Sequence, residues 1–137
     1  MFTITLGEAI DRHGIDVGDH LDRDITIAVL DGLQLQGDVA VVPTNTAAAP
    51  EAVPVPTAGV PVVRGENGGN THLLLADGPA TFAPTDPTGL VLGLLTIGDE
   101  ATAWLAHPEH GYLGIAPGTY EIRRQREQAD EERLVAD

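Results

Sequence analysis

Residues 111–126 read GYLGIAPGTYEIRRQR, and this stretch decides the fold class. From Tyr120 to Arg123 apolar and charged side chains alternate, which is the period of two expected for a strand with one buried face. Pro117-Gly118 is a favourable central pair for a type II turn. A second strand is therefore expected before the turn, at 112–115.

Working outward, the chain repeats short apolar runs that are separated by turn residues such as Asp31-Gly32 and Asp77-Gly78. The runs that we predict as strands are 25–30, 39–42, 60–63, 72–75, 80–82, 90–97 and 101–105. Strands at this spacing predict a mainly β domain over residues 25–127, either a β-sandwich or a barrel of about eight short strands.

Three segments depart from the strand pattern. Residues 1–24 form a partly helical N-terminal arm, because Thr5 and Glu8 have the spacing of a capping box and Gly14 is a natural helix end. Residues 43–59 are rich in proline and alanine and predict an extended loop. Residues 128–137 are mostly charged and predict a short polar helix or tail.

Composition limits the possible functions. The 137 residues carry a net charge of -14 and include no lysine, so binding to nucleic-acid phosphates is not expected. The chain has no cysteine and no serine, which removes disulfides, thiolate chemistry and a serine triad. No signal peptide is visible and no apolar run approaches the ~20 residues of a membrane helix, so we expect a cytoplasmic protein that does not bind membranes.

The candidate chemistry lies at His107-Pro108-Glu109-His110, with Glu66 and His72 earlier in the chain. Imidazole and carboxylate ligands from different strands can form a site for Fe, Mn, Ni or Zn. The alternative is that His107 and His110 lie in a loop and bond backbone groups. Glu109 with a histidine would act as an acid–base pair only if burial shifted its pKa.

Several motifs resemble a family of small bacterial and phage proteins of uncharacterised function, whose members read roughly QGDV, GExTGHxH and HxEHxxLxLPxGxYxVxxQRE. The matching residues are Gln36-Gly37-Asp38-Val39, Gly65-Glu66, Asn70-Thr71-His72, His107-x-x-His110, Pro117-Gly118-x-Tyr120 and Arg124-Gln125-Arg126-Glu127. The resemblance covers 34–137, apart from the proline-rich loop. It implies a fold and the position of a site, and Asn70 stands where relatives have the first histidine of H-x-H.

The set Glu66, His72, His107 and His110 also resembles the metal site of cupins, although Glu66 precedes His72 here instead of following it. This resemblance implies a cupin-like metal-binding protein or enzyme that holds one divalent transition metal.

The second group of candidate residues points to protein contacts. Arg123, Arg124 and Arg126 form the basic cluster of an acidic chain. Trp104 is expected in the core, with an interface as the alternative, and Tyr120 completes the candidate interaction set. The function that we expect is a non-catalytic interaction or assembly module without a cofactor, which forms homo-oligomers or docks on another protein. The alternative is a cupin-like metal-binding protein or enzyme.

Overall fold

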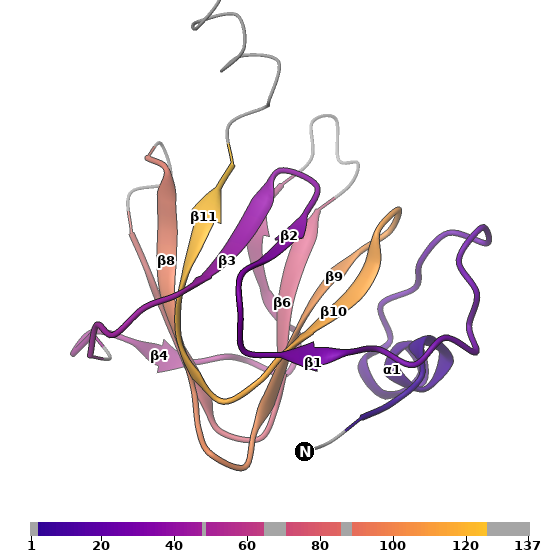
Figure 1. Ribbon diagram of the computed structural model, residues 1–137, viewed down its shortest axis with the longest axis horizontal. Coiled ribbons are helices and arrows are strands. Elements are labelled where there is room, and N and C mark those ends of the chain that lie inside the picture. The colour runs from indigo at the N-terminus through magenta and orange to yellow at the C-terminus, as the bar shows by residue number, and fades with distance from the viewer. Residues whose placement is uncertain (1–2, 48, 65–70, 86–88, 126–137) are drawn as a thin grey trace, which may run out of the picture.

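The computed structural model describes residues 3–47, 49–64, 71–85 and 89–125. In these residues one helix precedes eleven strands, which form two sheets (Figure 1). The five-stranded sheet has the order β1-β10-β9-β6-β5. Its strands are β1 (Val29–Leu30), β5 (Val60–Val63), β6 (His72–Asp77), β9 (Thr102–His107) and β10 (Gly111–Ile115).

The six-stranded sheet has the order β2-β3-β11-β8-β7-β4. Its strands are β2 (Gln34–Gln36), β3 (Val39–Pro43), β4 (Val53–Pro54), β7 (Ala80–Pro84), β8 (Val91–Ile97) and β11 (Gly118–Arg124). The pairs are antiparallel except β1 with β10, which is parallel.

The main core lies between the two sheets. Leu74, Leu105 and Ile115 come from one sheet, and Leu95 and Ile122 come from the other; all are fully buried. The prediction of a mainly β domain is therefore confirmed. Of the two architectures that the strand pattern left open, the sheets form two packed layers and do not close into a barrel.

The turn pair Pro117-Gly118 joins strands that do not pair with each other, because β10 and β11 belong to different sheets. Gly118 has a φ of 146°, in the region where a side chain would be strained. The Tyr120 hydroxyl, inside the core, donates to the Ala116 carbonyl at 2.7 Å and so fixes the connection from β10 to β11.

The N-terminal helix α1 (Leu6–His13) covers the outer face of the five-stranded sheet (Figure 1). The predicted capping box of Thr5 and Glu8 is present in both directions, and Gly14 ends the helix with a φ of 74°. Leu6 and Ala9 of the helix share a second core cluster with Trp104, which lies on the opposite face of the sheet from the main core.

Two predicted segments differ in detail. Of residues 25–30 only Val29–Leu30 pairs as a strand, and Ile25 is 55% exposed. Inside the proline-rich segment, Val53–Pro54 pairs with β7 as an edge strand, a position that tolerates proline. The tail at 128–137 lies outside the described residues. Within the described part of the chain, no helix has the length and apolar character needed to cross a membrane.

Candidate functional site

Three of the predicted site residues come together at one end of the five-stranded sheet. His72 begins β6 and His107 ends β9, and the antiparallel pairing of these strands places their ends side by side. His110 lies in the turn that follows. The ring centroids are 4.3 Å apart for His72 and His107, 4.5 Å for His107 and His110, and 6.5 Å for His72 and His110. Glu66 lies outside the described residues.

The β2–β3 turn packs against the imidazole cluster of His72, His107 and His110. Gly37 in this turn has a φ of 57°, and a Cβ there would lie 3.1 Å from His110 Nε2 and 3.3 Å from His72 Cε1. Position 37 therefore favours glycine for two reasons: the backbone is in the left-handed region, and the histidine rings leave little room for a side chain.

His72 is buried and hydrogen-bonded through both ring nitrogens. Nδ1 lies 2.9 Å from Gln36 Oε1, and Nε2 lies 3.0 Å from Asp38 Oδ1. Burial lowers the pKa of His72, while the Asp38 carboxylate acts in the opposite direction. Both partners are acceptors, so the neutral ring, which carries one N–H, satisfies one of them at a time.

His107 ends β9 as a buried hydrogen-bond acceptor. Its Nδ1 receives the backbone N–H groups of Glu109 at 3.1 Å and His110 at 3.2 Å. Burial lowers its pKa to about 4, and the neighbouring rings of His72 and His110 act in the same direction. His107 is therefore neutral at pH 7, and the lone pair of its Nδ1 holds the β9–β10 turn. For His107 this is the bonding to backbone groups that the alternative to a metal site predicted. The residue lies at the end of a strand, however, and not in a loop.

The imidazole rings pack beside one another, and three of their nitrogens are used in hydrogen bonds. The planes of His72 and His110 are inclined by only 14°, and the nitrogens of His72 and the Nδ1 of His107 are already hydrogen-bonded. Among the residues that the structure describes, no group of three or more histidine or carboxylate side chains is arranged to hold a metal ion. Glu109 is exposed, so it lacks the burial that an acid–base role requires.

A feature that sequence reasoning missed is the orientation of β2. Gln34 and Gln36 point inward: Gln34 Nε2 donates to the Gly114 carbonyl at 2.8 Å, and Gln36 Nε2 donates to the carbonyls of Leu105 and Gly111 at 2.9 and 3.2 Å. The intervening Leu35 and the preceding Leu33 point outward and are 57% and 64% exposed. The strand thus buries amides and exposes leucines.

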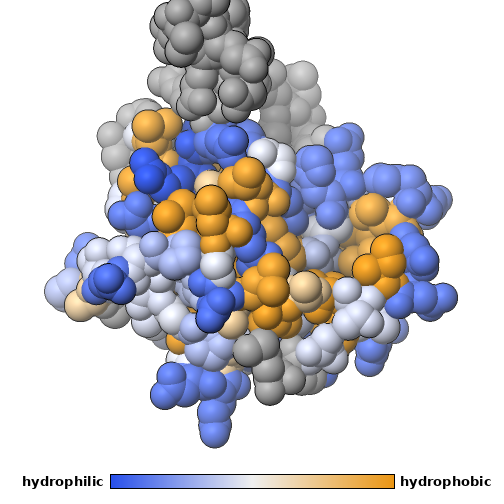
Figure 2. Space-filling model, viewed as in Figure 1, coloured by the Kyte–Doolittle hydropathy of each residue, from blue (hydrophilic) through white to orange (hydrophobic). Residues whose placement is uncertain are grey.

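The alternation of leucine and glutamine at 33–36 was the available signal for this strand. Hydrophobicity alone would have assigned the leucines to the core. Together with Leu30, which is 48% exposed, Leu33 and Leu35 form what we call the outer leucine surface. Figure 2 shows hydrophobic atoms gathered on the face that carries β1 and β2.

The predicted interaction residues are divided between the interior and the surface. Trp104 is fully buried with its Nε1 donating to Asp77 at 2.8 Å, and Tyr120 is 1% exposed. The expectation that Trp104 lies in the core is confirmed. The interface alternative for Trp104 and the contact role of Tyr120 are wrong, because neither side chain reaches the surface. Arg123 and Arg124 end β11, where the Arg123 side chain is 41% exposed and lies 3.9 Å from Glu121. Arg126 lies outside the described residues.

These features define a two-sheet β domain with an imidazole cluster, in which His72 and His107 are buried and His110 is exposed, beside an edge strand whose polarity is inverted. The chain belongs to the family described as Domain of unknown function (DUF8820), whose model matches residues 35–125. The match begins in β2 and ends after β11, so it contains the three histidines and leaves out α1. No curated protein and no solved structure matches the chain.

Proposed function

We propose that this chain is a non-catalytic assembly module of the cytoplasm, which forms homo-oligomers through the outer leucine surface of Leu30, Leu33 and Leu35. The observation that carries the proposal is the inverted polarity of β2, with amides inside and leucines outside.

The outward orientation of Leu33 and Leu35 is unfavourable in a monomer, and association of two chains would offset this by burying the leucines. Fully burying a leucine side chain is worth about 1.5–3 kcal/mol, and this gain is missing while the side chain faces water. The inward positions cannot take the leucines without leaving the carbonyls of Leu105, Gly111 and Gly114 without their amide donors. The outward positions carry no such requirement, so apolar residues there indicate a contact surface.

A second copy of the chain fits this surface best. Residues 32–37, which include Leu33 and Leu35, carry no charge, and Asp31 and Asp38 flank them. Two copies can therefore meet over Leu33 and Leu35 with little local repulsion, despite the net charge of -14 on each. Among the described strands, β2 pairs only with β3, which leaves its other edge open. A twofold axis at such an edge brings the same leucines and the same backbone groups against each other.

The test is the mass in solution of the wild type and of Leu33→Gln/Leu35→Gln, measured by light scattering over a concentration series. We expect a dimer or higher oligomer for the wild type and a monomer for the variant. Val53→Gln is the matched control, because Val53 is 56% exposed on β4 at the opposite edge of the same sheet. A wild type that stays monomeric at about 1 mM, where association worth only about 4 kcal/mol is visible, would contradict the proposal.

The cupin-like metal-binding function has one observation in its favour, the meeting of His72, His107 and His110. It is supported less well, because both nitrogens of His72 and the Nδ1 of His107 are used in hydrogen bonds. Elemental analysis of protein purified without chelator separates the two: about one equivalent of transition metal, lost in His72→Ala, would favour the metal function.

A further inference from the structure

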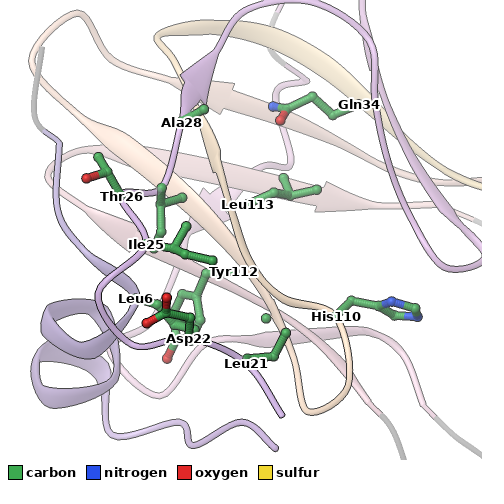
Figure 3. Close-up of a pocket in the computed structure, with 12 residues that line it drawn as sticks. Leu6, Leu21, Asp22, Ile25, Thr26, Ala28, Gln34, His110, Tyr112 and Leu113 are labelled. Carbon is green, nitrogen blue, oxygen red and sulfur yellow. The ribbon is translucent and has the colours of Figure 1, made fainter.

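A hollow lies between residues 21–28 and the strand β10, and neither Leu33 nor Leu35 lines it. We call it the β10 groove (Figure 3). Its volume is about 290 Å³. The larger apolar side chains that line it are Leu6, Leu21, Ile25, Ile27, Tyr112 and Leu113. This volume is at the lower limit of ligand pockets, which run from about 300 to 1,000 Å³, so it suits one or two side chains.

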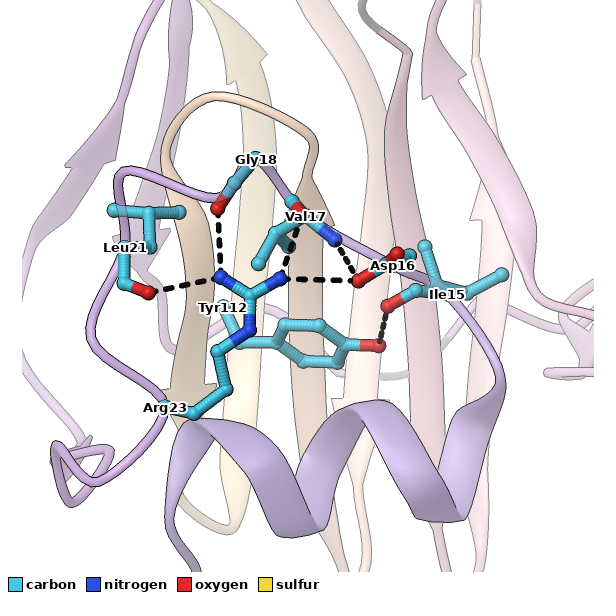
Figure 4. Close-up of polar contacts among 7 residues, drawn as sticks. All are labelled: Ile15, Asp16, Val17, Gly18, Leu21, Arg23 and Tyr112. Atoms are coloured by element: carbon cyan, nitrogen blue, oxygen red, sulfur yellow. Dashed lines mark hydrogen bonds and ion pairs between the residues drawn. The ribbon is translucent and has the colours of Figure 1, made fainter.

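The arm that forms one wall of the groove is held in place by Arg23 (Figure 4). Its guanidinium donates to four oxygens at 2.7–3.2 Å, those of the Gly18, Leu21 and Val17 carbonyls and the Asp16 carboxylate. The Tyr112 hydroxyl, from the opposite wall, donates to the Ile15 carbonyl at 2.8 Å. A wall fixed in this way loses little conformational freedom when a partner binds.

Apart from Tyr112, the ionisable side chains that line the groove are Asp22 and His110. Of the described residues that line it, Asp22 is the one carboxylate, and no arginine lines it because Arg23 is directed into the arm. Asp22 Oδ1 accepts the Asp24 amide at 2.9 Å, and both aspartates are exposed. An apolar floor with exposed carboxylates beside it complements an apolar side chain that has a cation next to it.

We propose that the β10 groove docks a segment of a partner protein in which a large aliphatic or aromatic side chain is flanked by lysine or arginine. Because the chain has no lysine and carries a net charge of -14, a basic partner protein complements the groove better than a second copy of the chain does. Gln34 of β2 lines the groove, but Leu30, Leu33 and Leu35 do not, so the groove adds a second partner to the proposed self-assembly.

The test is a titration of the ¹⁵N-labelled full chain with three probe peptides, followed through the amide signals of Leu21, Ile25 and Leu113. The probes are acetyl-Gly-Lys-Leu-Lys-Gly-amide, its Glu-Leu-Glu counterpart and its Lys-Gly-Lys counterpart. We expect saturating shifts with the Lys-Leu-Lys peptide alone. The variant Asp22→Asn should weaken its binding about two- to five-fold, the effect of one exposed charge pair, and Asp31→Asn, which removes a charge elsewhere, should not.

Three results would overturn the proposal. These are shifts of equal size with the acidic peptide, the absence of saturation at about 5 mM peptide, and shifts of the groove amides when the protein alone is diluted, which would put a second copy in the groove. Repeating the titration on the Leu33→Gln/Leu35→Gln variant separates the two proposals. Peptide binding should persist there whether or not that surface mediates self-association.

Discussion

Gln36 and His72 meet across the two sheets, with Gln36 Oε1 2.9 Å from His72 Nδ1. Gln36 lies on β2 of the six-stranded sheet and His72 on β6 of the five-stranded sheet. The same amide donates to the Leu105 and Gly111 carbonyls, so one side chain joins the edge strand to the imidazole cluster and to the β9–β10 hairpin. Because Gln36 must face inward to do this, Leu35 must face outward.

Replacing Gln36 tests this cross-sheet connection. Gln36→Leu should lower the free energy of unfolding by about 1–3 kcal/mol, since it removes the buried hydrogen bonds to the Leu105 and Gly111 carbonyls and to His72 Nδ1. Urea unfolding followed by circular dichroism measures the loss. Leu35→Gln is the neighbouring control, and as an exposed site it should change monomer stability by less than about 0.5 kcal/mol. Equal losses in the two variants would show that Gln36 has no special role.

Stability should depend on the charge of His107. Its pKa is lowered from 6.5 to about 4, so the unfolded chain takes up a proton at this residue before the folded chain does. The contribution of neutral His107 to the free energy of unfolding is complete above pH 6.5. It is lost as the pH falls toward 4, by at most about 1.4 kcal/mol per pH unit for one proton.

The variant His107→Asn isolates this effect, because the asparagine oxygen can accept the turn amides but does not titrate. The free energy of unfolding of the wild type minus that of the variant should stay constant from pH 8 to 7 and then fall between about pH 6.5 and 4. A difference that is independent of pH would mean that His107 is not held neutral.

Asp77 should control the docking of α1. Its carboxylate accepts from Trp104 Nε1 and lies 3.3 Å from His13 Nε2 and 3.5 Å from Arg12. Asp77→Ala should therefore increase hydrogen exchange in α1 much more than in β8, and should shift the tryptophan fluorescence. Asp99→Ala removes an exposed carboxylate elsewhere and serves as the control. Unchanged exchange in α1 would show that apolar packing alone holds the helix.

Salt should affect the two proposed contacts in opposite directions. Association of two chains of charge -14 should strengthen as salt screens their repulsion. Binding of a basic peptide beside Asp22 should weaken under the same change. Light scattering and the peptide titration at about 50 and 500 mM salt provide the comparison, in a range where the screening length falls from above to below 10 Å. Self-association that weakens with salt would point to a charged contact instead of the leucines.

Much of the fold could be predicted because local signals and tertiary structure agree. The strand at β11 has a clear period of two, and the capping box of Thr5 and Glu8 depends on neighbouring residues alone. The meeting of His72, His107 and His110 was anticipated from their positions in motifs. Their hydrogen bonds were not, since Gln36 and Asp38 lie more than 30 positions before His72 in the chain.

The orientation of β2 could not be predicted for a physical reason. A pattern of leucine and glutamine tells which residues share a face, but the face that is buried depends on the acceptors that the other sheet presents. Here those acceptors are the carbonyls of Leu105, Gly111 and Gly114, which favour amides inside. Trp104 was expected in the core and lies there, whereas Tyr120 was misplaced as a contact residue, because aromatic side chains occur in both cores and interfaces.

The most direct test of the leucine contact uses the absence of cysteine from the chain. Leu35→Cys places a single thiol on the outer leucine surface, and Val53→Cys places one of similar exposure on β4. Under mild oxidation at about 10 μM protein, Leu35→Cys should form a covalent dimer within minutes and Val53→Cys should remain largely monomeric on a non-reducing gel, because a disulfide needs Cα atoms within about 7 Å. Equal rates of cross-linking, or none at position 35, would contradict self-assembly through this surface.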